Sequence, residues 1–186
     1  MSIETEQRFL ALRTLDEYRN FSQITLRFSG IRKSVFHGVE DGHPVAIKLF
    51  HDPVTAKSDA THEFDAYTML FNSPLKLYVP EPGRVLHRQK TVAAFSVLWK
   101  EGGSFADMKK TYYPPRVQLD FLRSQLLGLR QPPFPSQTMW DPANIAHDKI
   151  KGVWFTTCAL DYEISLQFFR NKMLNALNHL ITDYCA

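Results

Sequence analysis

This chain has few cysteines, a small net charge and no long apolar run, and each of these features argues against a class of protein. The two cysteines, Cys158 and Cys185, cannot build a disulfide framework, so we expect a reducing environment. The net charge of +3 is small and the basic residues are scattered, which argues against a dedicated nucleic-acid binder. No apolar run approaches the roughly 18 to 20 residues of a membrane span. The N-terminus is acidic and lacks the apolar stretch of a secretory signal.

These shortages favour a cytoplasmic protein, whether it acts in its own cell or is delivered into another. The apolar share of 44% and the aromatic share of 13% are high enough to build a hydrophobic core. A length of 186 residues suits one domain or two small lobes that share a hinge. The histidines show no spacing typical of zinc ligands, so core or solvated histidines are the simpler interpretation.

Hydrophobic periodicity predicts an α+β fold, in which one helix is inserted after the third of five strands. The strands are expected at 23–28, 34–39, 44–50, 84–89 and 91–99, with an Asp-Gly turn in "EDGH". Helices are expected at 4–19, 58–71, 116–129 and 164–184, and a hairpin around the "KG" at 151–152. The apolar face of the third helix is expected to comprise Val117, Phe121, Leu122, Leu126 and Leu129. "KEGGSF" interrupts the pattern with two glycines, which suits a hinge.

The stretch "DGHPVAIKLFHD" places a lysine near the end of an apolar strand. With a period of two, Val45, Ile47 and Leu49 face one side of the sheet, and Ala46, Lys48 and Phe50 face the other. An ammonium group is costly to bury unless it is paired. The following predicted helix offers a partner, because Glu63 lies beside its apolar stripe. The alternative is a lysine whose stem covers apolar surface while its charge reaches water.

This order of elements, with "VAIK" on the third strand and a glutamate in the next helix, resembles the protein kinase-like superfamily. The resemblance implies a two-lobed kinase-like fold, with an N-lobe over residues 1–100 and a truncated, mostly helical C-lobe over 101–186. The N-lobe would hold a five-stranded antiparallel sheet with one helix. Lys48 would neutralise ATP phosphates, Glu63 would hold Lys48 in place, and Ala46 would leave room for the adenine ring.

Two further segments match the kinase pattern in part. "FSGIRKSVFHG" stands where kinases have a glycine-rich loop over the phosphates, and keeps only Gly30 and the apolar Val35. An ordinary solvated hairpin turn is the alternative there. "SVLWKEGGSFADM" resembles the kinase hinge, so backbone groups from Trp99 to Glu101 would meet the adenine edge. Asp107 would then reach the ribose.

The catalytic segment departs from the family. In "SQTMWDPANIAHD", Asn144 matches the metal-holding asparagine, but Met139 stands where the catalytic aspartate is expected. A methionine cannot accept a proton, so an active kinase would need Asp141, from a distorted loop, or Asp161 to take over, or a different register of this segment. In "FTTCALDYE", Asp161 matches the aspartate that binds Mg²⁺. Its alternative role is to cap the last helix.

Three functions therefore stay open. The missing base favours a nucleotide-binding pseudokinase that acts through a protein partner. Retention of both metal ligands favours an active, atypical minimal kinase, a transferase that moves the ATP γ-phosphate to a protein or small-molecule hydroxyl with Mg²⁺. The chain looks like the minimal kinase fold of some bacterial effector kinases, or like a truncated relative of the small-molecule kinases. The third function is a non-enzymatic α+β interaction module.

Overall fold

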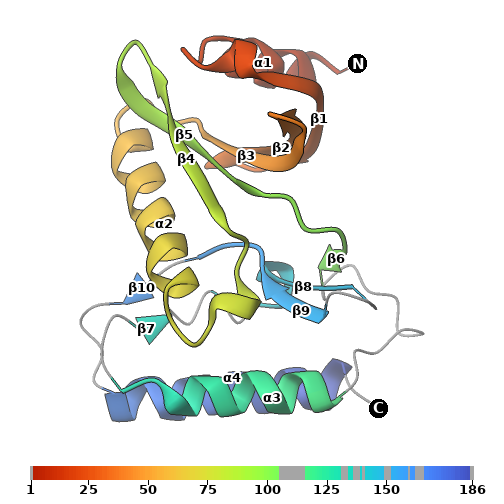
Figure 1. Cartoon of the computed structure of the whole chain (residues 1–186), viewed down its shortest axis with the longest axis vertical. Coiled ribbons are helices and arrows are strands. Elements are labelled where there is room, and N and C mark those ends of the chain that lie inside the picture. Colours follow the sequence, from red (N-terminus) through yellow and green to blue (C-terminus); the bar gives the residue numbers. More distant parts are fainter. Residues whose placement is uncertain are drawn as a thin grey trace. The chain divides into compact units, whose positions relative to one another are not determined.

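The computed structural model describes residues 2–104, 116–130, 134–135, 139, 141–148, 152–158, 160–161 and 166–184. Within these residues the fold is α+β, with four α-helices, a five-stranded antiparallel sheet and a small three-stranded sheet (Figure 1). The chain divides into two compact units. The first comprises Met1–Asp65 and Glu81–Trp99, and the second Ala66–Pro80 and Lys100–Ala186. No helix in the described part is both long and apolar enough to cross a membrane.

The first unit contains the five-stranded sheet. Its elements are α1 (Ile3–Arg13), the short 3-10 helix η1 (Tyr18–Asn20), β1 (Phe21–Ser29), β2 (Lys33–Glu40), β3 (His43–Phe50), β4 (Pro82–Arg88) and β5 (Thr91–Leu98). Helix α2 (Ala56–Phe71) follows β3 and begins in this unit. The sheet order is β1-β2-β3-β5-β4, with every neighbouring pair antiparallel. The five strands with one helix after the third, predicted from the sequence, are confirmed.

The apolar core of the first unit lies between α1 and one face of the sheet. Leu12 and Leu15 pack there against a cluster made of Phe21, Phe36, Val45, Ile47, Leu49, Leu86, Ala93 and Ala94. The cluster contains the three β3 residues that alternation placed on one face, so that prediction is confirmed. Helix α1 begins at an N-cap, where the Ser2 hydroxyl accepts a hydrogen bond from the Thr5 N–H at 3.2 Å.

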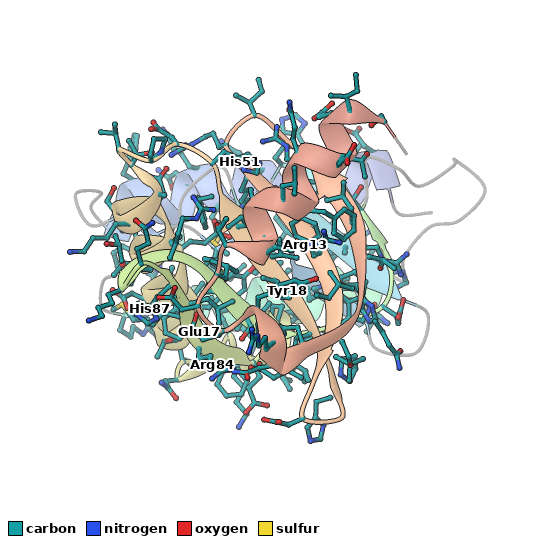
Figure 2. All side chains as sticks on the ribbon, turned by 90° about the horizontal axis from the view of Figure 1, so that it is seen from above. Arg13, Glu17, Tyr18, His51, Arg84 and His87 are labelled. Carbon is teal, nitrogen blue, oxygen red and sulfur yellow. The ribbon has the colours of Figure 1, made fainter. Side chains whose placement is uncertain are left out.

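Helix α1 ends at Arg13 instead of reaching residue 19, so the predicted boundary is wrong. The residues after it bind the β4–β5 hairpin. Asp16 accepts hydrogen bonds from the N–H groups of Gln89 and Lys90, at 3.1 and 2.9 Å. Glu17 accepts one from the His87 N–H at 2.8 Å, and its second oxygen lies 2.7 Å from the His87 ring nitrogen (Figure 2). These hydrogen bonds stabilise a turn after Arg13 in preference to a longer helix.

Two hairpin turns of the sheet use left-handed backbone conformations. The β2–β3 turn has Asp41 at φ 50° and Gly42 at φ 81°, which confirms the predicted Asp-Gly turn. The β4–β5 turn has Gln89 at φ 49° and Lys90 at φ 64°, without a glycine. Side chains disfavour this conformation, and the two hydrogen bonds to Asp16 offset the cost.

The second unit is built from short strands and two long helices. Its elements are the 3-10 helix η2 (Lys76–Tyr78), β6 (Gly103–Ser104), α3 (Arg116–Gly128), β7 (Phe134–Pro135), the 3-10 helix η5 (Pro142–Asn144), β8 (Ile145–Asp148), β9 (Gly152–Phe155), β10 (Leu160–Asp161) and α4 (Leu166–Tyr184). Strands β6, β8 and β9 form one sheet, and β10 pairs with β7. The predicted helices and the hairpin around residues 151–152 are confirmed.

Helix α3 buries a narrower face than the sequence predicted. Leu119, Leu122 and Leu126 are fully buried, at spacings of three and four. Of the apolar residues that predicted this helix, Leu122, Leu126 and Leu129 are buried, whereas Val117 is 70% exposed and Phe121 51% exposed. The end of α3 is held from α4, because Arg170 donates to the carbonyl oxygens of Leu127 and Leu129 at 3.2 and 3.4 Å.

Packing of α1 on the sheet predicts a large difference between two leucines of this helix. Leu12 is fully buried, whereas Leu10 is 53% exposed. We expect Leu12→Ala to lower the free energy of unfolding by about 2–5 kcal/mol, because it leaves a cavity, and Leu10→Ala to lower it far less. Urea unfolding followed by circular dichroism measures both. Equal effects of the two substitutions would contradict the packing of α1 described above.

Candidate functional site

Lys48 and Glu63 form a buried ion pair in the first unit. Lys48 lies near the end of β3 and Glu63 in the middle of α2, and they are 3% and 7% exposed. The Lys48 Nζ donates to Glu63 Oε1 at 2.9 Å. The ion pair predicted between the third strand and the following helix is therefore confirmed, and the alternative of a solvated lysine is wrong.

An aromatic ring lies beside the Lys48 ammonium. Its Nζ lies 5.7 Å from the centre of the Phe95 ring, which belongs to the facing position of β5. Phe95 also contacts Phe50 and Phe64, with ring centres 6.1 and 5.7 Å apart. Ion pairs gain strength where water is excluded, and cation–π contact adds to them. The sheet face opposite the α1 core therefore carries aromatic side chains together with the opposite charges of Lys48 and Glu63.

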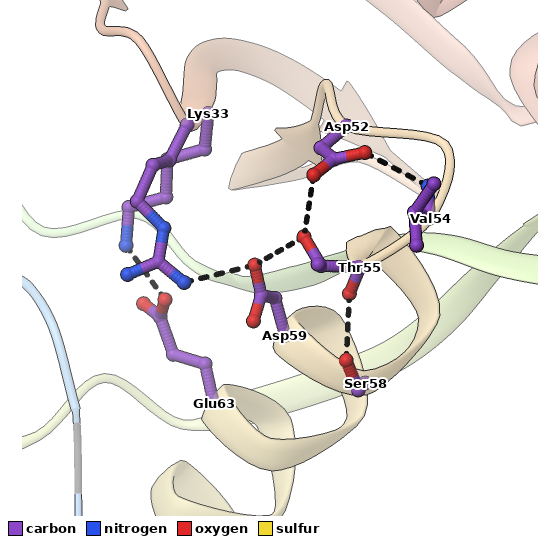
Figure 3. A network of polar contacts seen from close by, with 8 residues as sticks. Lys33, Asp52, Val54, Thr55, Ser58, Asp59 and Glu63 are labelled. Atoms are coloured by element: carbon purple, nitrogen blue, oxygen red, sulfur yellow. Dashed lines mark hydrogen bonds and ion pairs between the residues drawn. The ribbon is translucent and has the colours of Figure 1, made fainter.

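A second lysine binds the same carboxylate. The Lys33 Nζ donates to Glu63 Oε2 at 2.6 Å (Figure 3). Each carboxylate oxygen of Glu63 therefore binds a different lysine. The sequence pattern alone did not assign a role to Lys33. The register between β2 and β3 brings Lys33 to the site. Val35 pairs with Lys48 and Lys33 pairs with Phe50, so Lys33 lies on the same face of the sheet as Lys48.

The start of α2 carries a connected set of polar contacts. Arg32 donates to Asp59 at 2.9 Å, and Asp59 lies one helical turn before Glu63. The Thr55 hydroxyl lies within hydrogen-bond distance of both Asp59 and Asp52, at 3.0 and 3.3 Å (Figure 3). Two consecutive basic residues of the β1–β2 turn thus pair with two acidic residues one turn apart on α2. These contacts hold the turn against the helix.

The charge of Glu63 depends on this arrangement. Burial opposes its ionisation, but the nearby charges of Lys48 and Lys33 and their hydrogen bonds outweigh burial, so the pKa of Glu63 is lowered. The carboxylate is therefore ionised at neutral pH. Removing one partner of a buried ion pair leaves a charge without compensation, which costs about 3–5 kcal/mol in comparable cases.

The other predicted site residues of the first unit lie on or next to the sheet. Ala46 is buried on β3, one alternation step from Lys48, and Val35 is half-buried opposite Lys48. Gly30 lies in the β1–β2 turn, where its N–H donates to the Lys33 carbonyl at 3.0 Å. Trp99 follows β5; its N–H donates to Pro44 O at 2.9 Å and its ring contacts His37. A ligand at the predicted hinge would have to use backbone groups other than the Trp99 N–H.

The second unit holds the predicted catalytic segment. Met139 is fully buried, so Met139→Asp would bury a carboxylate and not supply a solvated one. Asp141 is exposed and caps η5, where it accepts a hydrogen bond from the Ala143 N–H at 2.8 Å. Asn144 is half-buried at the end of η5, and its N–H donates to Asp141 O at 2.7 Å.

The remaining predicted residues are placed by backbone alone or lie outside the described chain. Asp161 is the second residue of β10 and pairs in register with Phe134. Glu101 is exposed and lies just before β6. Asp107 lies outside the described residues. Among the residues that are described, no three His, Cys, Asp or Glu side chains gather as a metal site.

Gly102, next to Glu101, has a local structural role. Its φ is 141°, and a Cβ there would lie 2.2 Å from the Trp154 ring and 2.8 Å from the His147 carbonyl oxygen. A side chain at this position would clash with both. The glycine therefore permits close packing of this segment on β8 and β9 within the second unit.

Comparisons with known proteins do not assign this chain to a family. No model of a protein family matches the chain, and no curated protein has a significantly similar sequence.

The lowered pKa of Glu63 predicts a pH-dependent contribution to stability. Because its pKa in the folded protein lies below the ordinary value of 4.5, its charge contributes fully above that pH. The contribution is lost as the pH falls through the lowered pKa. We expect Glu63→Gln to reduce the free energy of unfolding by about 3 kcal/mol or more at pH 7, and the difference from wild type to shrink below pH 4.5.

Urea unfolding between pH 7 and pH 3 measures this difference. Glu6→Gln, at an exposed position of α1, is the matched control and should have little effect at any pH. A difference between wild type and Glu63→Gln that stays constant across the range would show that the Glu63 charge does not stabilise the fold.

Proposed function

We propose that this chain is a nucleotide-binding protein of two-lobed kinase-like design, with ATP and Mg²⁺ as ligands. The observation that carries the proposal is the buried Lys48–Glu63 ion pair between β3 and α2. A buried ion pair adds little stability over an apolar pair of the same size. A lysine held in a fixed position beside a small residue such as Ala46 is, however, well suited to bind phosphates.

The residues available for a metal fit the same proposal. Mg²⁺ prefers oxygen ligands, and Asn144 and Asp161 supply an amide and a carboxylate. They would hold the ion, which in turn neutralises phosphate charge. Lys48 would bind the phosphates, and backbone groups near Trp99 and Glu101 would bind the base.

Within this design we favour a pseudokinase that acts through a protein partner. The position of the usual catalytic base is occupied by Met139, which is buried and carries no proton acceptor. The nucleotide would then act as a ligand that stabilises one conformation.

An active, atypical minimal kinase is the second candidate, and one observation favours it. Asp141 is exposed and is the N-cap of η5, the one-turn 3-10 helix that ends at Asn144. A carboxylate in that position could accept a proton from a substrate hydroxyl. A non-enzymatic interaction module is the third candidate, and it predicts that no nucleotide binds.

Nucleotide binding predicts a rise in melting temperature. Ligand at about 100 times its Kd stabilises the folded protein by about 2.7 kcal/mol, so we expect Mg·ATP to raise the Tm by several degrees and ATP without Mg²⁺ to raise it less. Lys48→Met should abolish the shift. Lys57→Met, at an exposed position of α2, is the control and should keep it. No shift of the wild-type protein with either form of ATP would favour the interaction module.

Phosphoryl transfer separates the two kinase-like candidates. For the pseudokinase we expect no incorporation of label from γ-labelled ATP into the chain or a generic protein. Asp141→Asn keeps a side-chain acceptor for the Ala143 N–H and removes the base. If the wild type does incorporate label and Asp141→Asn lowers the rate about 100-fold or more, the active kinase is correct and the pseudokinase is rejected.

A further inference from the structure

Two ammonium groups are held close together by one carboxylate. Lys48 binds Glu63 Oε1 at 2.9 Å and Lys33 binds Glu63 Oε2 at 2.6 Å. Both also lie over aromatic rings that contact each other: Lys48 over Phe95 and Lys33 over Phe50, each 5.7 Å from the ring centre. The two ammonium groups are therefore held close together, next to the aromatic rings of Phe50 and Phe95.

The two lysines differ in their access to solvent. The Lys33 side chain is 17% exposed, whereas that of Lys48 is 4% exposed. Lys33 begins β2 directly after the β1–β2 turn, which is held in place by the Arg32–Asp59 pair. An anion that approaches from solvent would therefore meet Lys33 before Lys48.

The one glycine of the β1–β2 turn is not available to a phosphate. Nucleotide-binding glycine loops bind phosphate through backbone N–H groups, but here the Gly30 N–H donates to the Lys33 carbonyl at 3.0 Å. A Cβ at Gly30 would lie 2.8 Å from the Phe28 ring, so this ring covers Gly30. Ser29 and Ser34 pair directly across the turn. The Lys33 side chain is therefore a better candidate for binding phosphate here than the Gly30 backbone.

We propose that Lys33 is a second phosphate-binding residue, so that a polyphosphate is held by the side chains of Lys33 and Lys48 together in place of a glycine-rich backbone cradle. This inference rests on the proposed nucleotide site. The ligand class is a polyphosphate, because two ammonium groups that share one carboxylate match two neighbouring phosphate groups. In binding, the phosphate oxygens compete with Glu63 for Lys33, and no covalent bond changes.

The test is a set of dissociation constants measured by isothermal titration calorimetry at one ionic strength. The probes are Mg·ATP, adenosine and inorganic tripolyphosphate. We expect Lys33→Gln to weaken Mg·ATP and tripolyphosphate about tenfold or more, since each loses a charge-assisted hydrogen bond. Adenosine has no phosphate, so its affinity should stay within about twofold of wild type. Lys33→Arg keeps the charge and should restore most of the affinity for ATP.

Arg32→Gln is the matched control. It removes the neighbouring charge of the same turn and its ion pair with α2, but its partner is Asp59 and its side chain is 77% exposed. We expect it to change the affinity for Mg·ATP less than about threefold. An equal loss in Arg32→Gln and Lys33→Gln would show that a loosened turn, and not a lost phosphate contact, weakens binding, and would overturn the inference.

The other outcomes separate this inference from the proposed function. If Mg·ATP binds wild type and Lys33→Gln equally well, the role of Lys33 is overturned and the nucleotide site stands. If neither Mg·ATP nor adenosine binds the wild type, the proposed function fails. Tight binding of tripolyphosphate that depends on Lys33 would then still support Lys33 as a polyphosphate ligand.

Discussion

Glu63 is the residue on which the organisation of the first unit depends, because its two carboxylate oxygens join two strands to one helix. Lys48 from β3 and Lys33 from β2 both end on it. Burial alone would push this carboxyl toward its neutral form, and the two lysines keep it charged. The same contacts fix α2 against the sheet and hold the β1–β2 turn, which Arg32 secures further through Asp59. Removing the Glu63 charge would take away the anionic partner that Lys48 and Lys33 share.

A buried ion pair adds little stability over an apolar pair of the same size, and this is the basis of our proposal that a ligand binds here. The opposite face of the same sheet shows how the fold is held without charges, through α1 and a fully apolar cluster. Polar groups on the α2 side are instead placed where an anion could use them. In the second unit, the position expected for a catalytic base is a buried methionine, Met139, and the nearby Asp141 caps a 3-10 turn. These features are the basis of our proposal that the chain binds a nucleotide without transferring its phosphoryl group.

The site was predictable from the sequence where one local rule was enough. Alternation along β3 identified Lys48 as a lysine among buried residues, and helical spacing placed Glu63 beside the apolar stripe of α2. Lys33 escaped because its role depends on the register between β2 and β3, which pairs Val35 with Lys48. Register is set by the turn and by packing across strands, and a one-residue shift would turn Lys33 to the other face. The burial of Met139 was likewise invisible, since no periodic pattern surrounds it.

For the fold, the sequence by itself determined the order of strands and helices, the two faces of β3 and the Asp41-Gly42 turn, because each follows from periodicity or from one residue's backbone preference. Only the tertiary structure decided where α1 ends and how β4 joins β5. Gln89 and Lys90 adopt left-handed conformations because Asp16, far away in the chain, accepts their N–H groups. Tertiary contacts also turned Val117 and Phe121 of α3 to solvent. Short-range preferences are written in neighbouring residues, whereas these outcomes depend on partners that come together only when the chain folds.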